Sequence, residues 1–295
     1  MTTAARPALL QLLLLLVLPV IWALHFAFIK KIGADTDALA ALTALLAAVC
    51  ALYFGVLALK RQLFVFTRSR SIFFLVAGVL AYVVPLAAEM LAAPKIDAAV
   101  LTMIVSLTPV FTVAVAMGLR LIRPALRLIL SVIVGTIGIL LLLLESNTSV
   151  ESPTIWIIIA CLVPMAYALD ALYVEHFWPE GLNALQVAFG ESFVSLLILL
   201  TVAILAGVPG AAIGGWFLQI DFLILCVVTC IEVALFFYLV STAGAVMVNV
   251  ASFLVLPAGF FWGWLIFDEV ITIAGFGCVI CAVTALQLAR NYARE

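Results

Sequence analysis

Five ionisable residues lie within long stretches of apolar sequence. They are His25, Glu89, Asp170, Glu191 and Glu232. An ionised side chain at the centre of a membrane-spanning helix costs about 2.5–3.5 kcal/mol on the helix-insertion scale. Each of the five is therefore a candidate for binding a polar solute or for carrying a proton.

His25 and Asp170 occur in the same local pattern, in which a proline precedes an aromatic residue and the titratable residue follows three positions later. The two sets are Pro19, Trp22 and His25, and Pro164, Tyr167 and Asp170. Residues three apart share a helix face, so each ring would lie beside its titratable group. Asp170 could bind the ammonium group of an amino acid, and His25 could bind a carboxylate or relay a proton. A structural pair between His25 and Asp170 is the alternative.

Helix 71–93 is predicted to present Tyr82, Pro85 and Glu89 on one stripe, because seven residues nearly complete two turns. Pro85 removes a backbone donor and bends the helix, which frees a carbonyl that could line a wet cavity. Tyr82 is a cavity candidate, whereas Glu89 could bind substrate or be solvated near the helix end.

The second half of the chain adds further polar candidates. Glu232 lies near the middle of its span and is, with Asp170, the best acidic candidate. Glu191 lies on a helix whose orientation the sequence leaves open. Asn249 and Ser252 share a helix face and could bind substrate or join two helices, and joining helices is the commoner use.

Composition places these residues inside a membrane protein. Of 295 residues, 68% are hydrophobic and 9% charged, whereas soluble domains carry about 25% charged residues. Helices satisfy every backbone group internally, so the fold class is all-α integral membrane. Ten spans of about 20 residues are predicted, at 8–29, 37–59, 71–93, 98–119, 125–144, 153–174, 184–206, 217–240, 244–267 and 270–289.

The chain repeats one design twice. Pro19 and Pro164 start similar segments 145 residues apart, and Pro109 and Pro257 lie 148 residues apart in another similar pair. Two halves are predicted, 1–146 and 147–295, and an odd number of helices per half inverts the second copy around a central cavity. The paired prolines, with Pro85, are candidate kinks or hinges for alternating access.

Charge asymmetry predicts the orientation. With both termini in the cytoplasm, ten lysine or arginine residues lie on the cytoplasmic side and three on the other. This distribution follows the positive-inside rule.

Three segments resemble the drug/metabolite transporter superfamily, in its ten-helix EamA-type branch. They are Trp22 to Lys30, Ser106 to Thr112, and Phe253 to Glu269. The resemblance implies a secondary transporter of the bacterial inner membrane that exports small metabolites. Amino-acid exporters, including exporters of aromatic amino acids, are similar in length and plan, so amino acids are the expected substrates. Efflux of lipophilic cations is the alternative within transport.

Other function classes find less support in the sequence. A nucleotide-binding loop is missing, so no ATPase partner is evident, and a net charge of −2 does not indicate nucleic acid. No cofactor or metal is expected, and Cys278 and Cys281 fit small packing residues of an apolar helix. A membrane enzyme would need a catalytic motif, and a channel would need a filter-like loop or a ring of charges. The expected partners are a small-molecule substrate and the lipid bilayer, and the sequence fixes no oligomeric state.

Overall fold

The computed structural model describes residues 5–32, 37–92, 95, 101, 104–145, 154–268 and 273–292. Within these ranges the protein consists of helices and connecting turns. In chain order the first part contains α1 (Ala5–Ile32), α2 (Ala38–Leu59), α3 (Arg68–Gly78), the π-helix η1 (Val79–Val83), α4 (Val84–Ala92), α6 (Thr108–Gly118) and α7 (Leu126–Glu145). The second part contains α8 (Thr154–Ala160), α9 (Leu162–His176), α10 (Ala184–Leu205), α11 (Gly210–Gly215), η2 (Trp216–Leu218), α12 (Ile220–Ala243), α13 (Ala245–Ala251), η3 (Ser252–Leu254), α14 (Val255–Phe267) and α15 (Ile273–Tyr292).

Eight helices in the described residues are long and apolar enough to cross a bilayer. They are Leu9–Ile32, Ala38–Leu59, Arg68–Glu89, Thr154–His176, Ala184–Leu205, Ile220–Ala243, Ala245–Phe267 and Ile273–Arg290. The predicted spans 98–119 and 125–144 correspond to shorter apolar helices, Thr108–Gly118 and Leu126–Leu141. Most of 98–103 and the predicted boundary between the halves at 146 and 147 lie outside the described residues. The protein is thus an all-helical, multi-pass membrane protein.

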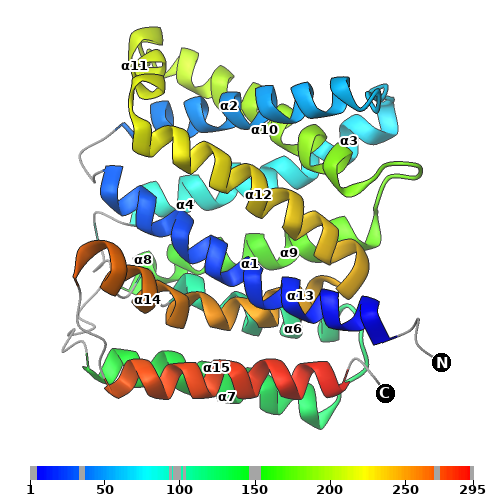
Figure 1. Cartoon of the computed structure of the whole chain (residues 1–295), viewed down its shortest axis with the longest axis vertical. Helices are drawn as coiled ribbons and strands as arrows, with labels where there is room; N and C mark the ends of the chain where they lie inside the picture. The colour runs from blue at the N-terminus through cyan, green and yellow to red at the C-terminus, as the bar shows by residue number, and fades with distance from the viewer. Residues whose placement is uncertain are drawn as a thin grey trace.

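The helices lie in layers, with α2 and α10 at one edge of the bundle and α7 and α15 at the opposite edge (Figure 1). Between these edges α1 packs on α12 and α14, while α9 packs on α4 and α6. The start of α1 and the end of α15 lie on the same side of the bundle (Figure 1). Segments from both parts of the sequence therefore alternate through the interior.

Three of the five predicted kink prolines follow interruptions in α-helical structure. A proline cannot donate to the carbonyl four residues before it, and its ring clashes with that carbonyl. The carbonyls freed in this way belong to Ala81, Ala160 and Phe253, before Pro85, Pro164 and Pro257. Ala81 lies in the π-helix η1, Ala160 ends α8, and Phe253 lies in the 3₁₀ turn η3.

The other two prolines are accommodated differently. Pro109 lies in the first turn of α6, where a missing N–H costs little. The carbonyl that it leaves free, on Val105, accepts a 2.6 Å hydrogen bond from Oγ1 of Thr108. Pro19 lies within α1, which continues through it.

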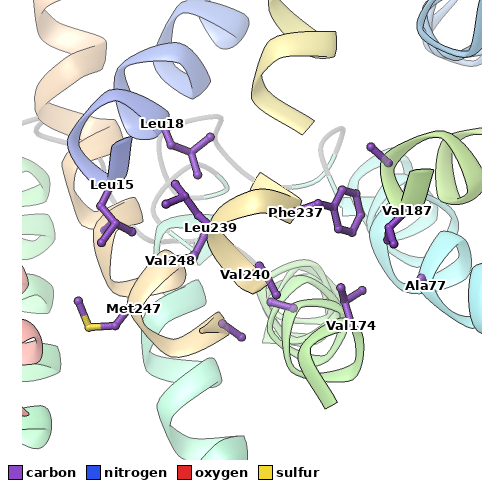
Figure 2. Close-up of a cluster of buried hydrophobic side chains, with 14 of the residues drawn as sticks. Leu15, Leu18, Ala77, Val174, Val187, Phe237, Leu239, Val240, Met247 and Val248 are labelled. Carbon is purple, nitrogen blue, oxygen red and sulfur yellow. The ribbon is translucent and has the colours of Figure 1, made fainter. Parts of the chain in front are cut away.

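The largest hydrophobic cluster joins helices from both parts of the chain. Leu15 and Leu18 of α1 lie near Leu239 of α12 and Val248 of α13 (Figure 2). The same cluster continues to residues of α3, α9, α10 and α12, which are Ala77, Val174, Val187, Phe237 and Val240. These side chains are buried, so the two parts share one core.

Close approach of α7 and α15 depends on a glycine. A Cβ atom added at Gly138 would lie 2.9 Å from Cβ of Cys281 and 3.5 Å from Cα of Cys278. No side chain larger than hydrogen fits there without moving α15. Gly55 in α2, by contrast, has nothing within 4 Å of an added Cβ.

We expect Gly138→Leu to destabilise the protein by about 1–3 kcal/mol, the usual cost of overpacking. Gly55→Leu is the matched control and should leave stability unchanged or slightly higher, since leucine favours helix over glycine. Thermal unfolding in detergent measures both variants. Equal melting temperatures for the two variants would contradict this packing.

Candidate functional site

Three acidic side chains, here called the carboxyl cluster, are enclosed in the bundle. Asp170 in α9, Glu191 in α10 and Glu232 in α12 retain 4%, 3% and 5% of their exposure. Helix α12 contacts both α9 and α10, and η1 contacts the same two helices. Buried acids in a membrane protein are costly and mark functional positions by default.

His25 makes a short polar contact with one member of the carboxyl cluster. Its Nδ1 lies 2.6 Å from Oε1 of Glu232 and 3.1 Å from Oγ1 of Thr229. Both partners are in α12, so the pair joins α1 to α12. The observed partner of His25 is thus Glu232 on α12. The alternative predicted from the sequence was a pair with Asp170, which lies on α9.

Two tyrosines lie near the acids of the carboxyl cluster. Tyr82, in the π-helix η1, lies within electrostatic range of all three carboxyl groups, of which Glu191 interacts most strongly. Tyr167, one turn before Asp170, lies within range of Asp170, Glu232 and Glu89. π-Helical segments are frequent at functional sites, and here the segment carries Tyr82 to the carboxyl groups.

Aromatic contacts lie beside the pair of His25 and Glu232. The ring of Trp22, on α1, lies 6.1 Å from that of Phe236 on α12, at an interplanar angle of 46°. The hydroxyl of Tyr53, on α2, donates a 2.6 Å hydrogen bond to the carbonyl of Cys230. The carboxyl groups are therefore neighboured by rings from α1, α2 and α12.

Asn249 and Ser252 make helix-joining and local bonds. The side-chain amide of Asn249 donates to Oγ1 of Thr112 at 2.7 Å, which links α13 to α6. Ser252 donates to the carbonyl of Asn249 at 2.6 Å, at the start of η3. Glu89, the remaining acidic candidate, is half-buried in α4.

Five buried side-chain oxygens have no hydrogen-bond partner among the described residues. One belongs to each acid of the carboxyl cluster, and two belong to serines of α10: Asp170 Oδ1, Glu191 Oε2, Glu232 Oε2, Ser192 Oγ and Ser195 Oγ. Buried polar atoms are normally bonded, and exceptions call for a ligand, water or proton. Each of these oxygens therefore needs a proton, a water or a bound molecule as its partner.

Polar contacts tie α1 to α12 at both ends. At one end the amide of Gln11 donates a 2.6 Å hydrogen bond to the carbonyl of Thr242. At the other end Nζ of Lys31 lies 2.7 Å from Oδ1 of Asp221. The two helices are antiparallel, and the pair of His25 and Glu232 lies between these contacts in sequence.

A hollow of about 550 Å³ lies where α12 turns into α13, at the same end as Gln11. It is lined by Glu175, Trp178 and residues 240–244. Gly244 makes the turn at φ 86°, and Oε2 of Glu175 accepts a 2.9 Å bond from the N–H of Ala245. Glu175 therefore caps α13 across the turn.

Comparison with known proteins relates part of the chain to a family. Residues 9–144 match the EamA-like transporter family. The predicted resemblance to the drug/metabolite transporter superfamily is confirmed, and members of this family move small molecules across membranes.

The fold is shared with solved structures. One, titled only "Crystal structure of protein", has a TM-score of 0.73 and 14% sequence identity to this chain, and the match covers 94% of this chain and 98% of the other. At this identity the match shows the fold alone. No curated protein matches the sequence.

Sequence reasoning singled out Glu232 and His25 separately, but neither their contact nor the contact of Thr229 with His25. Thr229 lies one turn before Glu232, and helical spacing could have indicated that they share a face. Glu191 could be noticed in the sequence as an acid within an apolar span. It has no counterpart in the first half of the chain that would have indicated which way its side chain faces. In the described ranges no group of three or more histidine, cysteine, aspartate or glutamate side chains could hold a metal ion.

We expect His25→Phe to destabilise the protein by about 3–5 kcal/mol, because it leaves Glu232 buried without its polar partner. The double variant His25→Phe/Glu232→Leu should recover most of that loss, since an apolar pair needs no desolvation of charge. Melting temperatures in detergent measure each variant.

The exposed pair of Lys31 and Asp221 supplies the control. Lys31→Met should cost less than about 1 kcal/mol. Additive effects of the two substitutions at His25 and Glu232 would show that these residues do not form a pair.

Proposed function

We propose that this protein is a secondary transporter that exports small organic metabolites, with amino acids as the leading substrate class, by alternating access. The observation that carries the proposal is the carboxyl cluster, buried among helices of both halves and left with unpartnered oxygens. A purely structural core gains no stability from enclosing three acids with one histidine. A binding site for a polar solute, by contrast, needs such groups to bind the solute.

The helix contacts support two inverted halves of five helices, 1–146 and 147–295, around a central cavity. In such a repeat α1 corresponds to α8 and α9, α2 to α10, α3 and α4 to α12, α6 to α13 and α14, and α7 to α15. The contact of α1 with α12 then has its counterpart in α9 with α4, and α1 with α14 has its counterpart in α9 with α6. Exchanging the two halves also converts the contact between α2 and α12 into the contact between α10 and α3, and both contacts are present.

Three contacts would lie on the pseudo-two-fold axis, because exchange maps each onto itself. They are α2 with α10, α7 with α15, and α6 with α13. Transporters built this way open a central site to one side and then the other by rocking one half against its partner. The shorter helices α6 and α7 would complete ten passes.

The location proposed is the bacterial inner membrane, with both termini in the cytoplasm. The start of α1 and the end of α15 lie on one side of the bundle (Figure 1). Arg61, Arg68 and Arg70 lie between α2 and α3 or at the start of α3, and Arg120 and Arg123 follow α6. The positive-inside rule favours a cytoplasmic position for these loops. The N-terminal four and C-terminal three residues lie outside the described ranges.

Proton coupling is proposed through His25, Asp170 and Glu232. His25 already shares a short contact with Glu232, and histidine is the side chain suited to exchanging a proton near neutral pH. Uniport is the alternative, and an imposed pH gradient separates the two.

Efflux of lipophilic cations is the second candidate. It is favoured by the aromatic rings of Trp22, Phe236 and Tyr82 near several carboxyl groups, because a cation is attracted to both. Amino acids and lipophilic cations can be tested on one preparation.

We expect saturable flux of labelled amino acids into proteoliposomes, and about a tenfold or larger loss in Asp170→Asn, because a charge-assisted bond to substrate is removed. Asp268→Asn is the matched control: Asp268 is exposed at the end of α14 in the left-handed region, which asparagine adopts readily. Uphill flux driven by a pH gradient would add proton coupling.

Two results would contradict this assignment. Normal flux in Asp170→Asn would remove that residue from the mechanism. Folded protein that moves lipophilic cations but no amino acid would establish the second candidate instead.

A further inference from the structure

Glu191 is the member of the carboxyl cluster that the proposed mechanism has not used. It is 3% exposed, it lies in α10, and its Oε2 has no hydrogen-bond partner. The carboxyl groups of Asp170 and Glu191 lie within electrostatic range of each other. Two acids from different helices thus approach each other in the bundle interior, each with a free acceptor.

Tyrosines, rather than lysine or arginine side chains, surround this pair among the described residues. The groups that interact electrostatically with Asp170 and Glu191 include Tyr82 and Tyr167, but in the described part of the chain they include no lysine or arginine. His25, the nearest candidate base, is held by Glu232 at 2.6 Å. A substrate carboxylate would therefore meet like charge here and find no free cation.

The same surroundings are rich in acceptors. Besides the two carboxyl groups, Ser192 and Ser195 of α10 have buried hydroxyl oxygens without partners. Ser195 lies against Gly78 of α3, where an added Cβ would collide with its Oγ. The Ser195 hydroxyl therefore occupies the space that a side chain at residue 78 would take, and it has no hydrogen-bond partner among the described residues.

An alkylammonium group matches this arrangement. It has three N–H donors, no acceptor and one positive charge. Hydrogen bonds between ionised partners are about twice as strong as neutral ones, and a cation is also attracted to the face of a tyrosine ring. A bound ammonium would supply the positive charge that balances these two buried acids.

We propose that Asp170 and Glu191 bind the protonated amino group of the transported molecule from two sides, and that this group, rather than a carboxylate, is required for recognition. This inference rests on the proposed transport function and narrows its substrate class to primary amines, among which amino acids are one kind. His25 then serves Glu232 and does not bind the substrate carboxylate.

The ligand series that tests the proposal needs no substitution in the protein. Unlabelled competitors are added to proteoliposomes that carry out flux of a labelled amino acid. The decarboxylated amine of that amino acid should compete within a few-fold of the parent. The N-acetyl derivative, which keeps the side chain and carboxylate but has no ammonium, should compete at least about tenfold less well.

Glu191→Gln tests the residue itself, with Glu180→Gln as the matched control on an exposed loop position. We expect Glu191→Gln to raise the half-saturating concentration of the amino acid by about tenfold or more and to reduce the preference over the N-acetyl derivative. Glu180→Gln should change neither value.

The outcomes separate this inference from the proposed function. If flux is saturable but the N-acetyl derivative competes as well as the parent, ammonium recognition is wrong while transport stands. A folded Glu191→Gln with unchanged selectivity removes Glu191 from the site. If neither the amino acid nor its amine is transported by folded protein, the proposed function fails and the inference fails with it.

Discussion

A charge inside a bilayer has no water to solvate it, and this constraint determines how the centre of the protein is built. Glu232 meets it with His25 at 2.6 Å and with Thr229 nearby. Among the described residues Asp170 and Glu191 have no such basic partner, and each keeps an unpartnered oxygen. The remaining charge must be neutralised by a proton or by a bound cation. A site that exchanges one for the other is what a solute carrier requires.

The architecture brings these groups together from distant parts of the sequence. His25 comes from α1, Tyr82 from η1 and the acids from α9, α10 and α12. Helix breaks near Pro85, Pro164 and Pro257 occur on three of the spans, and glycine allows α7 and α15 to pack closely. At its two ends the interface of α1 and α12 is held by Gln11 with Thr242 and by Lys31 with Asp221. In the proposed alternating access, these two ends would open in turn, which would expose the carboxyl cluster first to one side of the membrane and then to the other.

Much of this fold follows from the sequence, because apolar length and helix-breaking residues act locally. The helical membrane fold was predicted from composition, and Pro85 and Pro164 were predicted near interruptions that the structure contains. The pairing of His25 with Glu232 could not be predicted, because it depends on how α1 and α12 are rotated about their axes. Glu191 is a similar case: its position in an apolar span was visible, but its neighbours depend on the packing of α10 against η1. For Asn249 the sequence was sufficient: joining two helices was the commoner of its two predicted roles, and its hydrogen bond to Thr112 joins α13 to α6.

The most direct test of alternating access measures distances at both ends of the interface between α1 and α12. Spin labels are placed on exposed neighbours of these contacts, at Leu10 and Ser241 in one sample and at Ile29 and Ile220 in another, after replacement of the six native cysteines. Pulsed electron paramagnetic resonance in lipid nanodiscs then measures each distance with and without the transported solute. Alternating access predicts two distances at each end. Any condition that lengthens the distance at one end should shorten the distance at the other end. A single unchanging distance at both ends would contradict it.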